Sequence, residues 1–253
     1  MQIHTLELPK HWEQVVLYPV SDMHTGDILF ARKEFEAFSD MILREPNRFI
    51  MVNGDIMNNN LRDSKGSPYE DIMSPNDQVK EVIRLLLPLK DRIVGMNNGN
   101  HEDRTKDKAG VDITEHIAES LGVPFNEDEN LFKIKVGERT KNKQFVYTVY
   151  ITHGRCGGKR PGAILNAVED LSKNVLADVY VMGHAHRRMA HVAEFREPDL
   201  RNNKITMRKQ LYVVGAGWLY YGGYPVRHMM RPQVRGAHPI ILSGTEKNVS
   251  TII

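Results

Sequence analysis

The segment IVGMNNGNHE, residues 93–102, joins a short apolar run to a polar turn. Residues 93–96 have the length and apolar content of a buried β-strand, and glycine with polar residues follows where that strand should end. Asparagine, histidine and glutamate side chains in one turn are suited to metal binding and proton transfer. The segment therefore predicts a strand that delivers chemically active side chains at its carboxyl end.

Four other apolar runs end in polar clusters of the same kind. The clusters are Asp22-Met23-His24 after residues 15–20, Gly54-Asp55 after 49–52, His153-Gly154 after 145–152, and Gly183-His184-Ala185-His186 after 177–182. Each one alone is weak, since Asp-x-His is usual in surface loops and a lone histidine is often structural. Carboxyl ends of strands in an open α/β sheet face a common crevice, so the five clusters together predict one site of imidazole, carboxylate and amide ligands.

The rest of the chain alternates helical and extended patterns. Helices are expected over residues 32–43, from Ser74-Pro75 onward, over 111–121 and over 161–171, from apolar spacing, capping residues and glycine stops. Further strands are expected over 131–136, 145–152, 177–182, 189–195, 210–214, 239–242 and 248–253, the first two forming a hairpin. Strand–helix alternation followed by strand-rich sequence predicts an α/β fold with two sheets flanked by helices.

Composition limits the class of protein. The 253 residues are 41% hydrophobic and 26% charged, which suits one globular domain over residues 1–253. The single cysteine, Cys156, cannot form an internal disulfide and favours a reducing compartment. The first twelve residues lack a signal-peptide pattern and no apolar run is long enough for a bilayer. We therefore expect a cytoplasmic protein without a membrane partner.

Charge is unevenly distributed along the chain. Residues 1–150 carry 19 Lys and Arg against 25 Asp and Glu, whereas residues 151–253 carry 15 against 7. A basic half is typical of proteins that bind an anionic substrate or nucleic acid. The alternative interpretation is an asymmetric solvated surface, and metal ligation by some of the acids would reduce the asymmetry.

The order Asp-x-His, Gly-Asp, Gly-Asn-His-Glu, His, Gly-His-x-His resembles the calcineurin-like metallophosphoesterase superfamily, over residues 22–186. The resemblance implies a four-layer fold in which two mixed β-sheets pack as a sandwich with helices outside. It also implies two divalent ions, with manganese expected and iron, zinc, nickel or magnesium as alternatives. The implied ligands are Asp22, His24 and His186 for the first ion, Asn100, His153 and His184 for the second, and Asp55 for both.

The implied reaction is hydrolysis of a phosphate ester by a metal-bridging hydroxide, because two close cations make hydroxide available near neutral pH. Asp55 must be an anion to bridge two cations. Asn100 is neutral, which lets an anionic substrate approach. The resemblance places His101 at the substrate phosphate, to protonate the leaving oxygen or to stabilise charge. The alternative for His101 is a supporting hydrogen-bond donor.

The substrate is less determined than the metal site. Protein phosphatase is disfavoured because residues 56–60, IMNNN, lack the arginine expected after Gly-Asp, and Arg104 does not restore it. Arg155 in the loop 155–160 and Arg187 after His186 are candidate phosphate contacts, with ordinary exposed charge as the alternative. Trp218, Tyr220 and Tyr221 either stack a base or, as favoured, belong to the core.

The resulting hypothesis is a phosphodiesterase acting on DNA, RNA or a nucleotide-like substrate. One rival is a phosphomonoesterase that acts on a small phosphorylated metabolite. The other is a non-catalytic scaffold of the same fold, which is disfavoured because every ligand position and the Asn100-His101 pair are retained.

Overall fold

The computed structural model describes residues 2–62, 64, 69, 71–155, 158, 160–227, 229 and 231–252. Its strands form two mixed sheets, each of parallel and antiparallel pairs. The five-stranded sheet has the order β11 (Val249–Thr251), β10 (Ile240–Ser243), β2 (Gln14–Val20), β3 (Arg48–Asn53), β4 (Ile93–Asn97). The six-stranded sheet has the order β1 (Ile3–Glu7), β5 (Glu129–Thr140), β6 (Lys143–Thr152), β7 (Val179–Met182), β9 (Lys204–Val214), β8 (Met189–Asp199).

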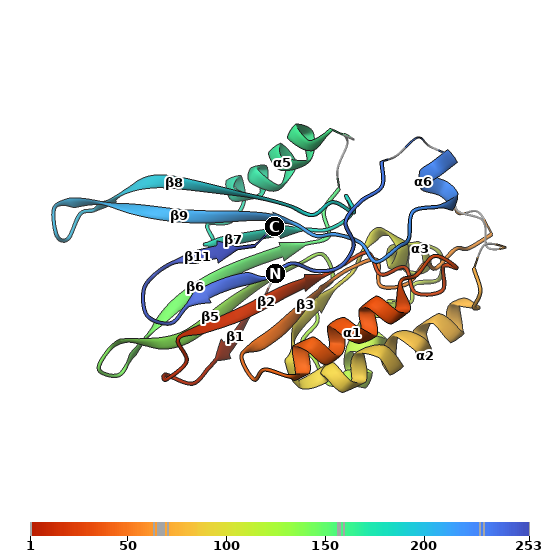
Figure 1. Ribbon diagram of the computed structural model, residues 1–253, viewed down its shortest axis with the longest axis horizontal. Coiled ribbons are helices and arrows are strands. Elements are labelled where there is room, and N and C mark those ends of the chain that lie inside the picture. The colour runs from red at the N-terminus through yellow and green to blue at the C-terminus, as the bar shows by residue number, and fades with distance from the viewer. Residues whose placement is uncertain are drawn as a thin grey trace.

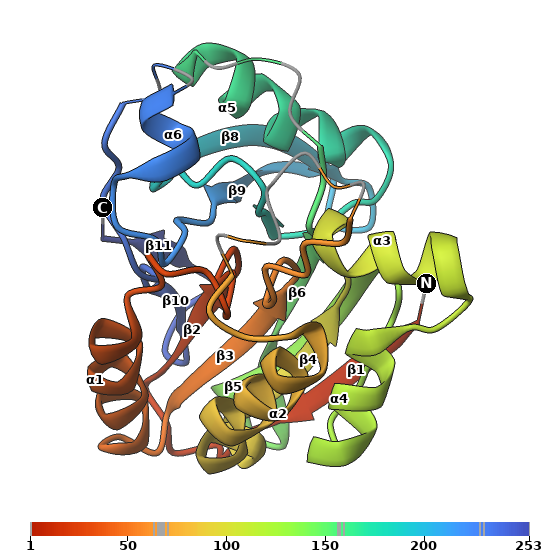
Figure 2. The same ribbon diagram turned by 90° about the vertical axis from the view of Figure 1, so that its right-hand side faces the viewer.

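Helices cover the outer faces of the two sheets (Figures 1 and 2). The helices are α1 (Arg32–Leu43), α2 (Pro75–Leu86), α3 (Asn100–Ala109), α4 (Ile113–Leu121), α5 (Pro161–Asp170) and α6 (Gly223–Arg227), with 3-10 turns at Leu87–Arg92 and Leu171–Lys173. α1, α2 and α4 pack against the five-stranded sheet, and α5 packs against the six-stranded sheet. The predicted α/β sandwich of two mixed sheets with flanking helices is confirmed.

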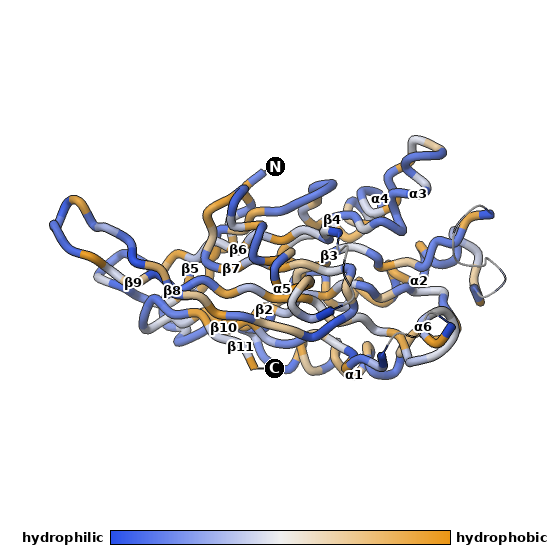
Figure 3. Tube along the Cα trace, turned by 90° about the horizontal axis from the view of Figure 1, so that it is seen from above, coloured by the Kyte–Doolittle hydropathy of each residue, from blue (hydrophilic) through white to orange (hydrophobic). Residues whose placement is uncertain are grey.

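Alternation along the strands divides the core into layers. In β2, Val15 and Leu17 face the other sheet, whereas Val16 and Val20 face the helices. Successive side chains of a strand point to opposite faces, and both faces of this strand are covered, so its sequence is a continuous apolar run. In Figure 3, the tube accordingly has much of its hydrophobic colour along the core strands.

Local sequence signals agree with most element boundaries. The Ser74 side chain accepts a hydrogen bond from the Asp77 N–H at the start of α2, as its place before Pro75 predicts. Gly122, with φ of 68°, ends α4 in the left-handed conformation. Strand β1 and helix α3 were not predicted, and β8 and β9 are longer than residues 189–195 and 210–214.

Parallel pairing brings several strand ends to one edge of the molecule. β2 is parallel to β3 and β3 to β4, while β6, β7 and β9 are parallel in the other sheet. The segments that follow these strands lie toward the right of Figure 1, which is the side facing the viewer in Figure 2. All five predicted polar clusters follow the strands β2, β3, β4, β6 and β7.

Candidate metal centre

Five of the predicted ligand residues have a backbone conformation that is unusual outside glycine. Their φ angles are positive: Asp22 54°, His24 49°, Asp55 49°, His184 64° and His186 49°. Left-handed backbone costs a non-glycine residue about 1–2 kcal/mol, and such outliers concentrate at functional sites. His184 and His186 therefore lie in a strained loop after β7.

The first cluster joins the loop after β2 to the loop after β7. His24 Nε2 and His186 Nε2 lie 3.1 Å apart, and His186 Nε2 lies 3.2 Å from Asp22 Oδ1. The other Asp22 oxygen accepts the His184 backbone N–H at 3.2 Å. Two imidazole nitrogens and a carboxylate oxygen thus converge on one point from segments 162 residues apart.

The second cluster gathers ligands from β3, β4, β6 and β7. His153 Nε2 lies 3.2 Å from Asp55 Oδ2, and His184 Nδ1 lies 2.7 Å from Asn100 Oδ1. Asp55, His153 and His184 offer ligand atoms that all lie within 4.8 Å of one another, as do Asp22, His24 and His186. Asp55 also groups with His24 and His101. Its carboxylate therefore lies between the two clusters.

The ligand atoms are arranged to bind divalent cations rather than to hydrogen-bond to one another. Asp22 Oδ1 and His153 Nε2 are buried and make no hydrogen bond, despite their close neighbours. Buried polar atoms are normally satisfied, so unsatisfied atoms that converge indicate a missing partner. Imidazole donors suit zinc and iron, and carboxylate and amide oxygens suit manganese. The ligand roles of the individual residues stay a prediction.

Backbone carbonyl oxygens orient two of the histidine rings. His153 Nδ1 lies 2.8 Å from the Asn53 carbonyl, and His101 Nδ1 lies 2.6 Å from the Asn58 carbonyl. A carbonyl can only accept, so each Nδ1 carries the proton and each Nε2 is directed at the cluster. His101 Nε2 is 3.9 Å from Asp55 Oδ2. The sequence cannot reveal these partners, because main-chain carbonyl groups have no signature in it.

Glu102 supports the loop that carries Asp55. One of its carboxylate oxygens accepts the backbone N–H groups of Asp55 and Gly99, at 2.9 and 3.0 Å, and the other accepts that of Met57 at 2.9 Å. Burial and the charge of Asp55 raise the pKa of Glu102 to about 8, whereas the three N–H donors favour its ionised form. This role of Glu102 could not be predicted from the sequence, because its partners are main-chain N–H groups of other segments.

Two glycines allow close approach around the centre. A Cβ at Gly99 would collide with the backbone nitrogen and a carboxylate oxygen of Asp55. A Cβ at Gly217, in the segment after β9, would lie 2.7 Å from His186 Nδ1. Only glycine leaves room at these positions. Gly217 was missed because its segment was interpreted through its aromatic residues.

The candidate substrate contacts have mixed outcomes. Arg155 is exposed and Arg187 is half-buried, beside His153 and His186 in the chain, and their phosphate contacts stay predictions. Cys156 and part of the loop 155–160 lie outside the described residues. Trp218 is buried in the core, as expected. The core assignment is wrong for Tyr220 and Tyr221, which are exposed, and the Arg235 guanidinium lies 4.4 Å from the Tyr220 ring centre.

Charge within the cluster predicts proton release on metal binding. Burial opposes the charged form of His153, but the neighbouring Asp55 and Asp22 outweigh burial and raise its pKa to about 10. Below that pH the ring is protonated, and a metal ligand must lose this proton. We expect manganese binding to release at least one proton at pH 7.5 and to strengthen as pH rises toward 10.

Isothermal titration calorimetry of the metal-stripped protein with manganese, in buffers of different ionisation enthalpy, measures this number. The His153→Gln variant is the control, because it lacks the titrating ring and should release fewer protons. Binding heats of the unsubstituted protein that are identical in all buffers would contradict the prediction.

Comparisons with known proteins add similarities of fold only. No protein-family model and no curated protein matches the chain. A predicted phosphoesterase from Streptococcus pneumoniae TIGR4 is similar with 12% identity and a TM-score of 0.38, over 94% of this chain and 89% of that chain. Pseudomonas putida nuclease MPE is similar with 11% identity and a TM-score of 0.37, over 93% and 87%.

A third similar structure is the Haemophilus influenzae NAD nucleotidase, with 14% identity and a TM-score of 0.45. The match covers 95% of this chain but 49% of that one, so this chain spans about half of its length. All three TM-scores are below 0.5. Among the described residues, no helix combines the length and apolar character needed to cross a membrane.

Proposed function

We propose that the chain is a single-domain, metal-dependent phosphoric ester hydrolase that holds two divalent ions and cleaves phosphodiester bonds. The observation that carries the proposal is the shared position of Asp55, whose carboxylate groups with ligands of both clusters. Asp22, His24 and His186 would hold one ion, Asn100, His153 and His184 the other, and Asp55 both. Manganese is the proposed metal, and the single cysteine favours a cytoplasmic setting.

The bound ions would lower the pKa of water and neutralise the phosphate oxygens. The chain's own contribution is orientation. Strained loops hold the ligands before substrate arrives, which saves reorganisation during the reaction. His153 and His101 are fixed in one tautomer by carbonyl groups. Asn100 adds an oxygen ligand without adding negative charge that would repel a phosphate ester.

His101 is the proposed proton-transfer residue. Burial lowers the pKa of His101, so the neutral ring presents the Nε2 lone pair beside Asp55. A phosphate ester placed against Nε2 supplies negative charge that favours the protonated ring. The protonated Nε2 can then donate to the leaving oxygen, while Nδ1 keeps its bond to the Asn58 carbonyl.

The proposed substrate is a nucleic acid or nucleotide-like diester. Support comes from the excess of basic residues beyond residue 150 and from the positions of Arg155 and Arg187 next to ligand residues. Arg104 is less available, since its guanidinium donates to the Asn58 carbonyl at 3.3 Å and to the Asn60 side chain at 3.1 Å. Basic side chains that border an anion site favour an extended, multiply charged substrate.

The test compares hydrolysis of bis-p-nitrophenyl phosphate with that of p-nitrophenyl phosphate by protein that is first stripped of metal and then given manganese. We expect the diester to have the higher kcat/KM, and no turnover without metal. Faster monoester cleavage would replace the proposal with a phosphomonoesterase. Failure on both esters with every divalent metal would remove catalysis and leave a binding scaffold.

A further inference from the structure

None of the described strands pairs with the outer backbone edge of β8. Strand β8 ends the six-stranded sheet and pairs with β9 over all eleven of its residues. The strands at the other sheet edges, β1, β4 and β11, have five, five and three residues. The β8–β9 hairpin also extends beyond the rest of the molecule (Figure 1). A long edge strand is a template for pairing with another chain.

Pro198 reveals which backbone groups of β8 point outward. It lies opposite Ile205 in a ladder whose register is continuous from Met189 to Asp199. Proline has no N–H, so this pair must be of the non-hydrogen-bonded kind, and the two kinds alternate along an antiparallel ladder. Residues 190, 192, 194 and 196 therefore direct both N–H and C=O away from β9, and Pro198 directs its C=O outward.

Two of the outward residues, Glu194 and Arg196, are complementary in charge in one register. In antiparallel pairing with a second copy, the outward residues of one β8 must lie opposite outward residues of the other. Because the outward residues are every second residue, the twofold axis must pass through a residue and not between two residues. An axis at Phe195 places Glu194 opposite Arg196 twice, and also His191 opposite Asp199. An axis at Glu194 sets two glutamates opposite each other, and an axis at Arg196 sets two arginines together. Opposite charges favour the first register and like charges disfavour its neighbours.

We propose that the chain forms a twofold dimer by antiparallel pairing of β8 with a second copy, centred on Phe195. Phe195 is 44% exposed, and in this register it meets its own copy in a non-hydrogen-bonded pair, where side chains come closest. Leu200, which is 88% exposed at the turn of the hairpin, comes to lie beside Ala190 of the other copy. The pairing thus covers apolar surface that the isolated chain leaves in water.

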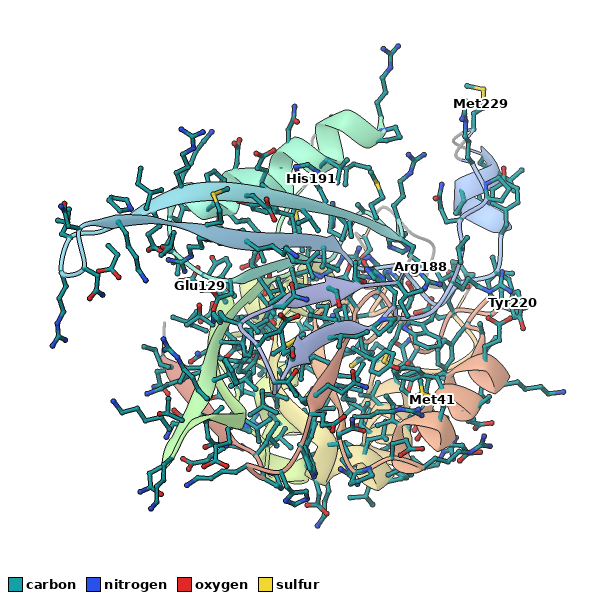
Figure 4. The ribbon with its side chains drawn as sticks, turned by 60° about the vertical axis from the view of Figure 1, so that its left-hand side comes forward. Met41, Glu129, Arg188, His191, Tyr220 and Met229 are labelled. Atoms are coloured by element: carbon teal, nitrogen blue, oxygen red, sulfur yellow. The ribbon has the colours of Figure 1, made fainter. Side chains whose placement is uncertain are left out.

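The dimer has a consequence for the candidate centre. β8 begins three residues after His186, and Figure 4 shows Arg188 where the strand starts and His191 further along it. In the proposed dimer, the hairpin turn of each copy lies beside residues 187–190 of the other copy. The two His186 residues are about 60 Å apart, from the rise per residue of an extended strand. Each centre then has the basic hairpin turn of the second copy beside it, with Arg201 and Lys204.

The first experiment measures the mass of the full chain by sedimentation velocity over a range of concentrations, with single and paired charge reversals. Glu194→Arg alone and Arg196→Glu alone each create two like-charge pairs, and should raise the dimer dissociation constant about tenfold or more. The double variant restores opposite charges and should recover the dimer. Glu138→Arg, the same change on the exposed part of β5, should have no effect.

The second experiment fixes the register by cross-linking in a Cys156→Ser background. Phe195→Cys places two thiols opposite each other on the axis, where Cα atoms about 4.5 Å apart allow a disulfide. Oxidised glutathione should yield a covalent dimer of this variant, but not of Val192→Cys, whose opposite residue is Pro198. A chain that stays monomeric, single reversals without effect, or cross-linking of Val192→Cys alone would each overturn the proposal.

Discussion

The substitution Asp55→Asn is expected to lower kcat/KM for bis-p-nitrophenyl phosphate on the order of a thousandfold or more, equivalent to about 4 kcal/mol of activation free energy. The amide has the size of the carboxylate but no charge to share between two cations. An amide nitrogen in the place of Oδ2 faces the Nε2 atoms of His153 and His101, which lie 3.2 and 3.9 Å from it. In the place of Oδ1 it faces the His101 backbone N–H, which Oδ1 accepts at 2.9 Å. The same change should lower bound manganese from two ions per chain to one or none.

Two controls separate loss of metal from loss of chemistry. Asp103→Asn makes the same chemical change on helix α3, outside the clusters, and should keep both activity and metal content. His101→Gln should lower turnover while the protein retains its manganese, because His101 is proposed to act on the substrate. Kinetics together with elemental analysis of the dialysed protein measure both quantities. An Asp55→Asn protein with two ions and normal turnover would refute the shared role of Asp55.

Much of the layered fold could be predicted, because a buried strand has a recognisable local sequence pattern. β2 and β3 are buried on both faces, so their sequences are apolar runs that end at turn residues. The Ser74-Pro75 start of α2 and the glycine after α4 are local signals of the same kind. Strand β1 was not predicted, since it lies at a sheet edge with three exposed residues and alternates too weakly.

The unpredicted elements depend on contacts distant in sequence. Helix α3 buries only Glu102 and has no apolar stripe, so periodicity cannot detect it. The outer parts of β8 and β9 are exposed, and within the described part of one chain they pair only with each other, which leaves no pattern of burial. Their pairing depends on the hairpin register, which short-range propensity does not specify.

In the candidate centre, too, some features could be predicted from local sequence and others depend on contacts distant in sequence. Histidine, aspartate and asparagine side chains after strands could be identified because both their chemistry and their place at strand ends can be seen in the sequence. The groups that orient these side chains could not be identified from the sequence. Gly217 and the Asn53 and Asn58 carbonyl groups contact the histidine rings from other segments of the chain. Sequence therefore indicates which atoms can bind a metal, and tertiary structure determines how those atoms are oriented.

Glu102 is the support with the largest expected effect on stability. The Glu102→Ala variant leaves three buried N–H groups, on Asp55, Met57 and Gly99, without an acceptor. Each orphaned donor costs about 1–3 kcal/mol, so the free energy of unfolding should fall by on the order of 4 kcal/mol. The loop that carries Asp55 loosens as well, so kcat should fall even in protein that remains folded.

The Glu102→Gln variant distinguishes a hydrogen-bonding role of Glu102 from a role in packing alone. The amide keeps the volume of the side chain but replaces one acceptor oxygen by a donor nitrogen, which must face at least one of the three N–H groups. We therefore expect the free energy of unfolding of Glu102→Gln to lie between those of wild type and Glu102→Ala, measured in urea on the metal-free protein above pH 8, where Glu102 is ionised. Wild-type stability in Glu102→Gln would mean that packing alone matters at this position. A fall in kcat with little change in KM, and manganese still bound, identifies Glu102 as a residue that positions Asp55, because it touches neither metal ligand atoms nor substrate.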